Sequence, residues 1–202
     1  MRLLLASNNA KKLRELDRVL TTAGVAGVSI VGLSEVKSYP EPKEDGATFE
    51  ENALIKARAG ARASGLPTIA DDSGLTVDAL NGMPGILSAR WSGRHGDDAA
   101  NNQLLLAQLA DTPDERRGAA FVSVCALVTP NGREEVARGE WSGRLLREPV
   151  GENGFGYDPL FVPAEAEPRS SAQLSPEEKD ALSHRGRALA QLVPVIAALA
   201  GQ

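Results

Sequence analysis

The sequence lacks several features that define specialised protein classes. Its 202 residues include one cysteine, Cys125, so no internal disulfide can form, and the apolar run around it predicts a buried thiol. Neither of the two histidines, His95 and His184, has a partner at zinc-ligand spacing. The 22 basic residues are outnumbered by 27 acidic ones, which argues against a protein that coats DNA or RNA and so against a nucleic-acid partner.

Long hydrophobic runs are also absent. The longest, residues 189–200, is shorter than the roughly 20 residues of a membrane span and is interrupted by Pro194. The apolar stretch after Met1 is too short for a signal peptide. We therefore expect a cytoplasmic protein without a membrane partner. A composition of 42% apolar and 24% charged residues is typical of a globular chain with a substantial core.

Strand and helix signals alternate along the chain, with no internal repeat and no linker between two halves. Asn131-Gly132 predicts a tight turn between two paired strands. Because such a hairpin adds antiparallel pairing to alternating strands and helices, the predicted fold class is mixed α/β. The pattern predicts strands over residues 3–6, 67–70, 119–128 and 134–141, and helices after the caps at 7–9, over 48–64 and 98–110, and from 175 onward.

A polar turn opens the first predicted helix and is the first candidate site, with residues Ser7, Asn8, Asn9, Ala10, Lys11 and Lys12. Two lysines in the first turn of a helix oppose the helix dipole. An anion bound at the helix N-terminus would explain them, because backbone N–H groups and lysine charge would converge on it. The alternative is a solvated basic turn balanced by Glu15.

Acidic residues supply the second candidate. Asp71 and Asp72 follow an apolar strand, at the place where open α/β sheets bind ligands. One carboxylate could hold Mg²⁺ or activate water while the other caps the next turn, or the segment could be a plain turn. The acidic loop 41–45 either adds a carboxylate to that metal or is solvated. On the following helix, Lys56 is either a phosphate contact or a surface lysine.

Two later segments combine glycine, aromatic and basic residues. Residues 151–159 contain glycines that allow close backbone approach to a ligand, although they match neither a dinucleotide fingerprint nor a P-loop. Phe155 and Tyr157 could present a ring to a nucleobase or be buried in the core. Lys179 and His184 lie five positions apart, so they serve one ligand only if the helix breaks between them; the alternative is a basic exposed helix face.

Six short blocks occur in order along the chain: Ser7-Asn8-Asn9-x-x-Lys12, Thr48-Phe49-x-Glu51-Asn52-Ala53, Asp71-Asp72-Ser73-Gly74, Gly82-Met83-Pro84-Gly85, Gly154-Phe155-Gly156-Tyr157-Asp158-Pro159 and Ser183-His184-Arg185-Gly186. Together they resemble the bacterial branch of the inosine triphosphate pyrophosphatase family, the dITP/XTP pyrophosphatases. The resemblance extends from Leu4 to about Leu192.

This resemblance implies a Mg²⁺-dependent hydrolase of deaminated purine nucleoside triphosphates (ITP, dITP and XTP). Such an enzyme cuts the α–β phosphate bond, releases the monophosphate and pyrophosphate, and so cleanses the nucleotide pool. The resemblance also implies a homodimer and an elongated mixed α/β fold. A single domain over residues 1–202 would then form two closely packed lobes, with the active site in the cleft between them.

By matching position, the resemblance makes Asp72 the general base and a metal ligand. It places Lys12 on phosphate and Phe155 against the base. The residues implied to contact substrate are Ser7, Asn8, Asn9, Ala10, Lys11, Lys12, Ser73, Phe155, Gly156, Tyr157, Asp158, Lys179, His184 and Arg185.

One position departs from the family pattern. Where family members commonly have two adjacent glutamates, this chain has Lys43-Glu44. We assign Glu44 as the second metal ligand, with Glu41 as a weaker substitute. Two alternatives stay open: a sensor that binds nucleotides without hydrolysing them, and a pyrophosphatase with a different base preference.

Overall fold

The computed structural model describes residues 1–201 and contains a six-stranded sheet in the order β2-β1-β3-β4-β5-β6. The strands are β1 (Arg2–Leu5), β2 (Ser29–Val31), β3 (Thr68–Val77), β4 (Gly118–Val128), β5 (Glu134–Leu145) and β6 (Phe161–Pro163). The α-helices are α1 (Ala10–Thr22), α2 (Phe49–Ser64), α3 (Asp98–Gln108), α4 (Pro176–Leu182) and α5 (His184–Leu199). Strand β1 is parallel to β2 and β3, whereas β5 and β6 are antiparallel, so the mixed α/β class is confirmed.

The chain forms two compact units. The first comprises Met1–Asp72, Ser123–Gly139 and the segment that begins at Arg185, and the second comprises Ser73–Val122 and Glu140–His184. Strands β3, β4 and β5 each contribute residues to both units.

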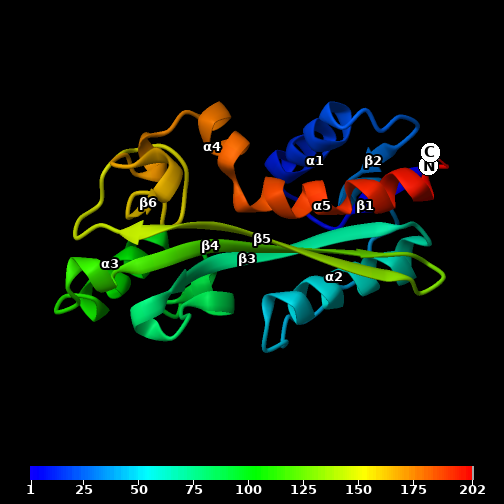
Figure 1. Cartoon of the computed structure of the whole chain (residues 1–202). Helices are drawn as coiled ribbons and strands as arrows, with labels where there is room; N and C mark the ends of the chain where they lie inside the picture. The colour runs from blue at the N-terminus through cyan, green and yellow to red at the C-terminus, as the bar shows by residue number, and fades with distance from the viewer. Residues whose placement is uncertain (202) are drawn as a thin grey trace. The chain divides into compact units, whose positions relative to one another are not determined.

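In the first unit, α1 and α5 lie on one face of the sheet and α2 lies on the other (Figure 1). Successive side chains along each strand point to opposite faces, so some strand residues pack against α1 and α5 and others against α2. Leu3, Leu5 and Ile69 belong to a buried cluster that includes apolar residues of α1 and α5. Leu4 points the opposite way and lies beneath α2.

Gly60 allows α2 to approach the sheet closely. A Cβ atom at this position would lie 2.7 Å from Thr68 Cγ2, 3.2 Å from the Tyr39 hydroxyl and 3.3 Å from Leu4 Cδ2. Glycine inside a helix lowers stability by about 0.5–1 kcal/mol relative to alanine. The close approach of α2 to the sheet therefore comes at the expense of helix stability. It brings Lys56 of α2 within reach of Asp72 in β3.

The second unit has its own aromatic core. Phe161 packs edge-on against Phe121 and Trp141, with ring centroids 4.7 and 5.6 Å away. Arg117 is 2% exposed and donates to the backbone carbonyls of Leu109, Leu145 and Leu146. This buried guanidinium therefore ties the end of α3 to the end of β5.

Most predicted elements are confirmed. Helix α2 begins after the Thr48 cap, whose hydroxyl accepts from the Glu51 N–H, and ends at Gly65 in the left-handed conformation. The second predicted capping box is also present, because Ser175 and Glu178 each accept a hydrogen bond from the other's backbone N–H. Cys125 is buried, as predicted, and burial raises the pKa of its thiol to about 12.

One local expectation is wrong. No turn begins at Asp71, because β3 continues to Val77. Strand geometry is possible here because both aspartates have cationic partners. Gly74 lies within the strand, where its missing side chain allows the backbone of Gly85 to approach. A Cβ atom at Gly74 would lie 2.4 Å from the Gly85 carbonyl oxygen, so only glycine permits this approach.

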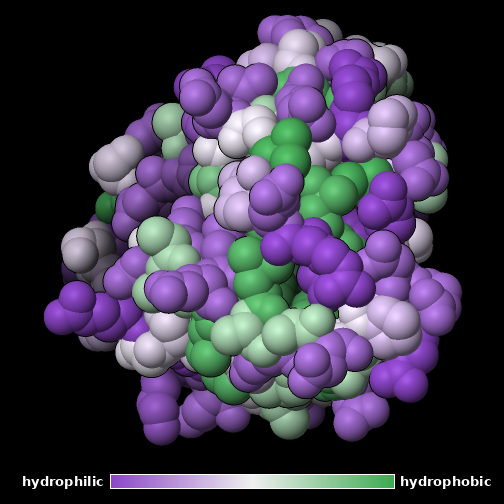
Figure 2. Space-filling view, turned by 90° about the vertical axis from the view of Figure 1, so that its left-hand side faces the viewer, coloured by the Kyte–Doolittle hydropathy of each residue, from purple (hydrophilic) through white to green (hydrophobic). Residues whose placement is uncertain are grey.

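Hydrophilic residues cover most of the face shown in Figure 2, and hydrophobic residues gather near its middle. Exposed large hydrophobic side chains include Met83, Val136 and Phe155. Within residues 1–201, no helix combines the length and the hydrophobicity needed to cross a membrane.

Candidate functional site

Asp71 is the centre of a buried ion network in the first unit. Its Oδ1 accepts from Lys12 Nζ at 2.7 Å and its Oδ2 from Arg185 Nε at 3.0 Å. Arg185 also donates to Glu15 at 3.4 Å. Burial alone would raise the pKa of Asp71, but Lys12 and Arg185 outweigh it and hold that pKa well below its usual range. Asp71 is therefore a permanent anion that fixes two cations.

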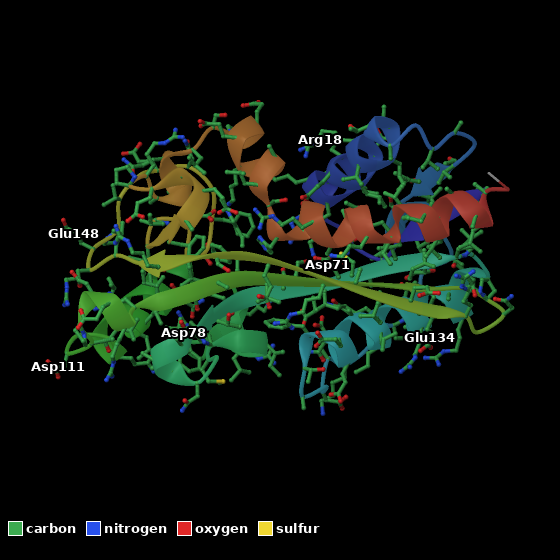
Figure 3. All side chains as sticks on the ribbon, in the orientation of Figure 1. Arg18, Asp71, Asp78, Asp111, Glu134 and Glu148 are labelled. Carbon is green, nitrogen blue, oxygen red and sulfur yellow. The ribbon has the colours of Figure 1, made fainter. Side chains whose placement is uncertain are left out.

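Helix α1 brings Lys12 to this anion. The Asn9 side chain caps the helix by accepting from the Lys11 N–H at 2.9 Å, as the sequence predicts. Lys12 then lies on the first turn and faces β3, whereas Lys11 is exposed. The alternative of a basic turn balanced by Glu15 is wrong for Lys12, whose partner is Asp71, while Glu15 pairs with Arg185. Figure 3 shows Asp71 at the middle of the sheet.

Asp72 has a separate set of partners. Consecutive strand residues point to opposite faces, so Asp72 faces α2 rather than α1 and α5. Its Oδ1 accepts from Lys56 Nζ at 3.4 Å and its Oδ2 from Asn52 Nδ2 at 3.2 Å. Lys56 also donates to Glu44 at 3.0 Å. Two carboxylates, Glu44 and Asp72, therefore share one ammonium group.

Burial and the neighbouring charges shift the pKa values of Asp72 and Lys56. Burial raises the pKa of Asp72 above the ordinary aspartate value, and the nearby Glu44 carboxylate adds to the rise. Burial alone would lower the pKa of Lys56, but Asp72 and Glu44 outweigh it and the pKa is raised. The side chain of Lys56 is only 17% exposed, so its interpretation as a surface lysine is wrong. The cluster offers a carboxylate of increased basicity beside a fixed cation.

The acidic loop before α2 contributes one carboxylate to this cluster. Lys43 points into solvent, with its side chain 85% exposed, and pairs with Asp45. Glu41 is exposed and, with Lys56, Asn8 and Tyr39, lines a cavity of about 360 Å³. Glu44 is thus the loop acid that contacts Lys56. Among the described residues no group of three acidic, histidine or cysteine side chains is arranged to hold a metal, so the two-carboxylate pair is the set to consider.

In the second unit, a glycine-flanked loop presents Phe155. Its side chain is 61% exposed, and Gly154 and Gly156 both have positive φ angles, 83° and 61°. The first turn of α3 holds this loop, because Asp98 accepts from the Gly156 N–H at 2.7 Å and Asn102 donates to the Gly156 carbonyl at 2.8 Å. The exposed ring is therefore displayed by a fixed backbone.

Asp158 fixes the same loop from within. It accepts from the Phe155 N–H, from Lys179 Nζ and from the Ser171 hydroxyl, and is 2% exposed. The Lys179 ammonium lies 5.0 Å from the centre of the Phe155 ring. Tyr157 belongs to the core and donates to the Ser88 carbonyl, so of the two aromatics only Phe155 offers its ring to a ligand.

The last helical region is broken, which is the condition under which Lys179 and His184 could serve one ligand. Helix α4 ends at Leu182 and α5 begins at His184, so Lys179 and His184 lie on different helices. The His184 ring stacks on Phe121 at 5.3 Å between centroids.

The remaining predicted residues surround the start of α1 and the middle of β3. Asn8 and Ala10 are exposed, and the Ser7 hydroxyl accepts from the Asn9 N–H at 3.2 Å. Ser73 is half-buried beside Asp72 in β3.

Sequence reasoning assigned no role to Asn52, Asp98 or Asn102. Asn52 stands one turn before Lys56, and this spacing on an otherwise apolar helix face could have marked it. Asp98 and Asn102 have the same four-residue spacing at the start of α3, but nothing in the sequence relates them to Gly156.

Comparisons with known proteins show the family of the chain. The sequence profile of the Ham1 family matches residues 3–195. The chain is 70% identical to the dITP/XTP pyrophosphatase of Corynebacterium efficiens over 100% of both chains, and 70% identical to that of Nocardia farcinica over 98% of this chain and 96% of the relative. The crystal structure of a nucleoside-triphosphatase, named dITP/XTP pyrophosphatase, from Mycobacterium abscessus is 65% identical, with a TM-score of 0.83 over 97% of this chain and 100% of that one. The resemblance carried by the six sequence blocks is confirmed, and the chain belongs to the Ham1 family.

Proposed function

We propose that this protein is a nucleoside triphosphate pyrophosphatase that hydrolyses ITP, dITP and XTP to the monophosphate and pyrophosphate, and so removes deaminated purines from the nucleotide pool. Relatives that carry the corresponding name match it along its whole length. The structural observation behind the proposal is that Asp72 and Glu44 share the Lys56 ammonium. A carboxylate beside an ammonium group supports the proposal, because the first could act as a general base and the second could attract phosphate.

The triphosphate binds to the basic side chains of the first unit. Lys12 and Lys56 are partly exposed ammonium groups held by carboxylates, with side chains 21% and 17% exposed. The N-terminal end of the α1 dipole adds positive partial charge next to Lys12. Ser7, Asn8 and Lys11 belong to the same turn. Preorganised cations of this kind stabilise the charge that develops on phosphate oxygens.

Asp72 acts as the general base. Its carboxylate takes a proton from water while the water oxygen attacks the α-phosphorus. The bond between that phosphorus and the oxygen bridging to the β-phosphate breaks, and pyrophosphate leaves with the electron pair. Because burial raises the pKa of Asp72, its carboxylate accepts the proton more readily than an exposed aspartate would.

Magnesium fits the acidic pair. Glu44 and Asp72 already direct oxygen atoms at one cation, the Lys56 ammonium. Mg²⁺ commonly takes one or two protein carboxylates and completes its shell with water and phosphate oxygens. Glu44 and Asp72 would hold the ion, which when bound would neutralise phosphate charge and polarise the bond to be cleaved.

The purine base is recognised by stacking and by hydrogen-bond donors. Phe155 provides the exposed ring face, with Lys179 beside it. Hypoxanthine and xanthine carry a carbonyl at position 6, where adenine carries an amino group. Backbone N–H groups beside the ring would donate to this carbonyl, whereas adenine would place donor against donor and leave both unsatisfied. His184 completes this set of residues.

The position of Lys43 favours hydrolysis over a sensor that only binds. Its side chain points into solvent and pairs with Asp45, while Glu44 remains with Lys56 and Asp72. The departure from the family pattern therefore leaves two carboxylates in place. As part of the same proposal the enzyme is a homodimer, which rests on the resemblance alone, and is cytoplasmic, which rests on the short hydrophobic runs of the sequence.

The decisive experiment measures product formation from ITP, XTP, dITP, GTP and ATP, each with and without Mg²⁺. Phosphorus NMR identifies the product, because cleavage at the α–β bond gives pyrophosphate and cleavage at the β–γ bond gives orthophosphate. We expect Mg²⁺-dependent pyrophosphate from the first three, well above ATP and GTP. Binding of ITP without any product would support the sensor. Preference for another base would support the third alternative.

A further inference from the structure

Asn52 is a buried amide whose two ends bind two separate parts of the candidate site. It is 2% exposed on α2. Its Nδ2 donates to Asp72 Oδ2 at 3.2 Å, and its Oδ1 accepts from the Gly46 N–H at 2.9 Å. One side chain thus connects β3, which carries the proposed base, to the loop that carries Glu44.

The loop depends on such contacts because it has no regular structure of its own. Residues 40–46 lie in neither a helix nor a strand. Three side chains of α2 hold it: Asn52 accepts from Gly46, Glu51 accepts from the Ala47 N–H at 2.5 Å, and Lys56 donates to Glu44. Of these, only Asn52 and Lys56 also contact Asp72.

The fit around the amide is tight. A Cβ atom on Gly46 would lie 2.8 Å from Asn52 Oδ1 and 2.6 Å from Glu51 Cβ. The loop backbone therefore lies directly against the Asn52 side chain. Any enlargement at Gly46 would displace either the loop or the amide.

An amide suits this position better than other side chains. It offers a donor to the Asp72 carboxylate and an acceptor to the Gly46 N–H, and it adds no charge. An aspartate would place a second negative charge against Asp72, and an apolar residue would leave the Gly46 N–H and one Asp72 oxygen without this partner.

We propose that Asn52 is a positioning residue for the hydrolysis proposed above. Its side chain holds Asp72 and Glu44 at the separation at which both can bind one divalent cation. The inference rests on the proposed function and adds to it a residue that acts through Asp72 and through the loop of Glu44. Groups that hold the ligands of a metal typically change metal affinity or activity by about 10–100-fold when they are removed.

The test compares two matched asparagines. Asn101 in α3 is also 2% exposed and also bridges a helix to a loop, since it accepts from the Ser92 N–H and donates to the Ala89 carbonyl. Asn52→Leu and Asn101→Leu therefore each remove two side-chain hydrogen bonds and make the same change in side-chain volume. We expect both to lower the melting temperature. Only Asn52→Leu should weaken Mn²⁺ binding, measured by calorimetry on the protein without nucleotide, by about tenfold or more.

The same pair separates positioning from substrate binding. In Asn52→Leu we expect kcat for dITP to fall about 10–100-fold, with KM changed less than about threefold, and the Mg²⁺ concentration for half-maximal rate to rise. In Asn101→Leu we expect all three values to stay within about twofold of the wild type. If Asn52→Leu does not fold, Gly46→Ala tests the same contact from the loop side and should move Mn²⁺ affinity and kcat in the same direction.

The outcomes separate this inference from the proposed function. A folded Asn52→Leu or Gly46→Ala variant that matches Asn101→Leu in Mn²⁺ affinity and kcat would overturn the positioning role alone. A wild-type protein that neither binds Mn²⁺ nor releases pyrophosphate would overturn the proposed function, and the inference with it.

Discussion

Asp71 and Asp72 are neighbours in β3, yet their carboxylates bind different partners. Asp71 accepts from Lys12 and Arg185, and Asp72 accepts from Lys56 and from the neutral amide of Asn52. Their pKa values move in opposite directions, because two cations outweigh burial at Asp71 and burial dominates at Asp72. Adjacent residues of one type thus differ in their surroundings, which make Asp71 a fixed anion and Asp72 the base of the proposed reaction.

Asp72→Asn should abolish pyrophosphate release while the protein stays folded. The amide keeps the shape of the carboxylate but cannot take the proton from water, and loss of a general base typically lowers the rate by about 10²–10⁴-fold. Pyrophosphate release from dITP measures the effect, with circular dichroism as the check on folding. A folded variant with full activity would remove Asp72 from the role of base.

Asp71→Asn should destabilise the protein in a pH-dependent way. Removing one partner of a buried ion pair typically lowers the free energy of unfolding by about 3–5 kcal/mol. The variant should therefore unfold at a lower urea concentration than the wild type at pH 7. Because folding lowers the pKa of Asp71, its contribution to stability is fully present above the ordinary aspartate pKa of 3.8 and is lost progressively as the pH falls below that value. The difference between wild type and variant should therefore narrow between pH 7 and pH 3.

The control for this experiment is an exposed acid. Asp111 lies on the surface, and Asp111→Asn should change the free energy of unfolding by no more than about 0.5 kcal/mol at either pH. A difference between wild type and Asp71→Asn that stays constant across this range would mean that the charge of Asp71 does not carry the stabilisation.

Lys12→Ala should chiefly weaken binding of the triphosphate. A hydrogen bond to a charged group contributes about 1.5–3 kcal/mol, so KM for dITP should rise by roughly 10–100-fold with a smaller change in kcat. Steady-state kinetics measure both values. Arg14→Ala, which removes an exposed charge from the same helix, should leave them within about twofold. Unchanged kinetics in Lys12→Ala would exclude Lys12 from the phosphate site.

Phe155→Ala should impair catalysis at little cost to stability. The ring is 61% exposed, so its removal takes few packing contacts from the folded protein. Stacking on a base contributes about 1–3 kcal/mol, so kcat/KM for dITP should fall by roughly 5–150-fold. Phe155→Tyr should retain most of the activity, and Val136→Ala serves as an exposed hydrophobic control. A loss in melting temperature without a loss in kcat/KM would assign Phe155 to the fold instead.

Local signals in the sequence predicted most of the elements. Capping residues such as Thr48 and Ser175 have side chains that bond their own helix, so their roles can be read from neighbouring residues. The apolar run of β4 and the turn before β5 are equally local. The break between α4 and α5 was not predicted, because the spacing of Lys179 and His184 showed only that a shared ligand would require it.

The course of β3 and the pairing of charges could not be predicted in this way. An Asp-Asp-Ser-Gly segment favours a turn when it stands alone. It lies in a strand here because Lys12 and Lys56, from two different helices, neutralise the two aspartates. Such partners are distant in sequence, and only the fold brings them together. The same holds for the contact of Asn102 with the loop of Phe155.

The absence of a side chain at Gly60 has a consequence for catalysis. Lys56 reaches Asp72 at 3.4 Å, near the limit of a hydrogen bond, and the distance of α2 from the sheet determines that reach. A single methyl group at Gly60 would act as a spacer between helix and sheet and lift the ammonium away from the carboxylate. The distance between the Lys56 ammonium and the Asp72 carboxylate therefore depends on Gly60, which lies one helical turn from Lys56 and has no polar side chain.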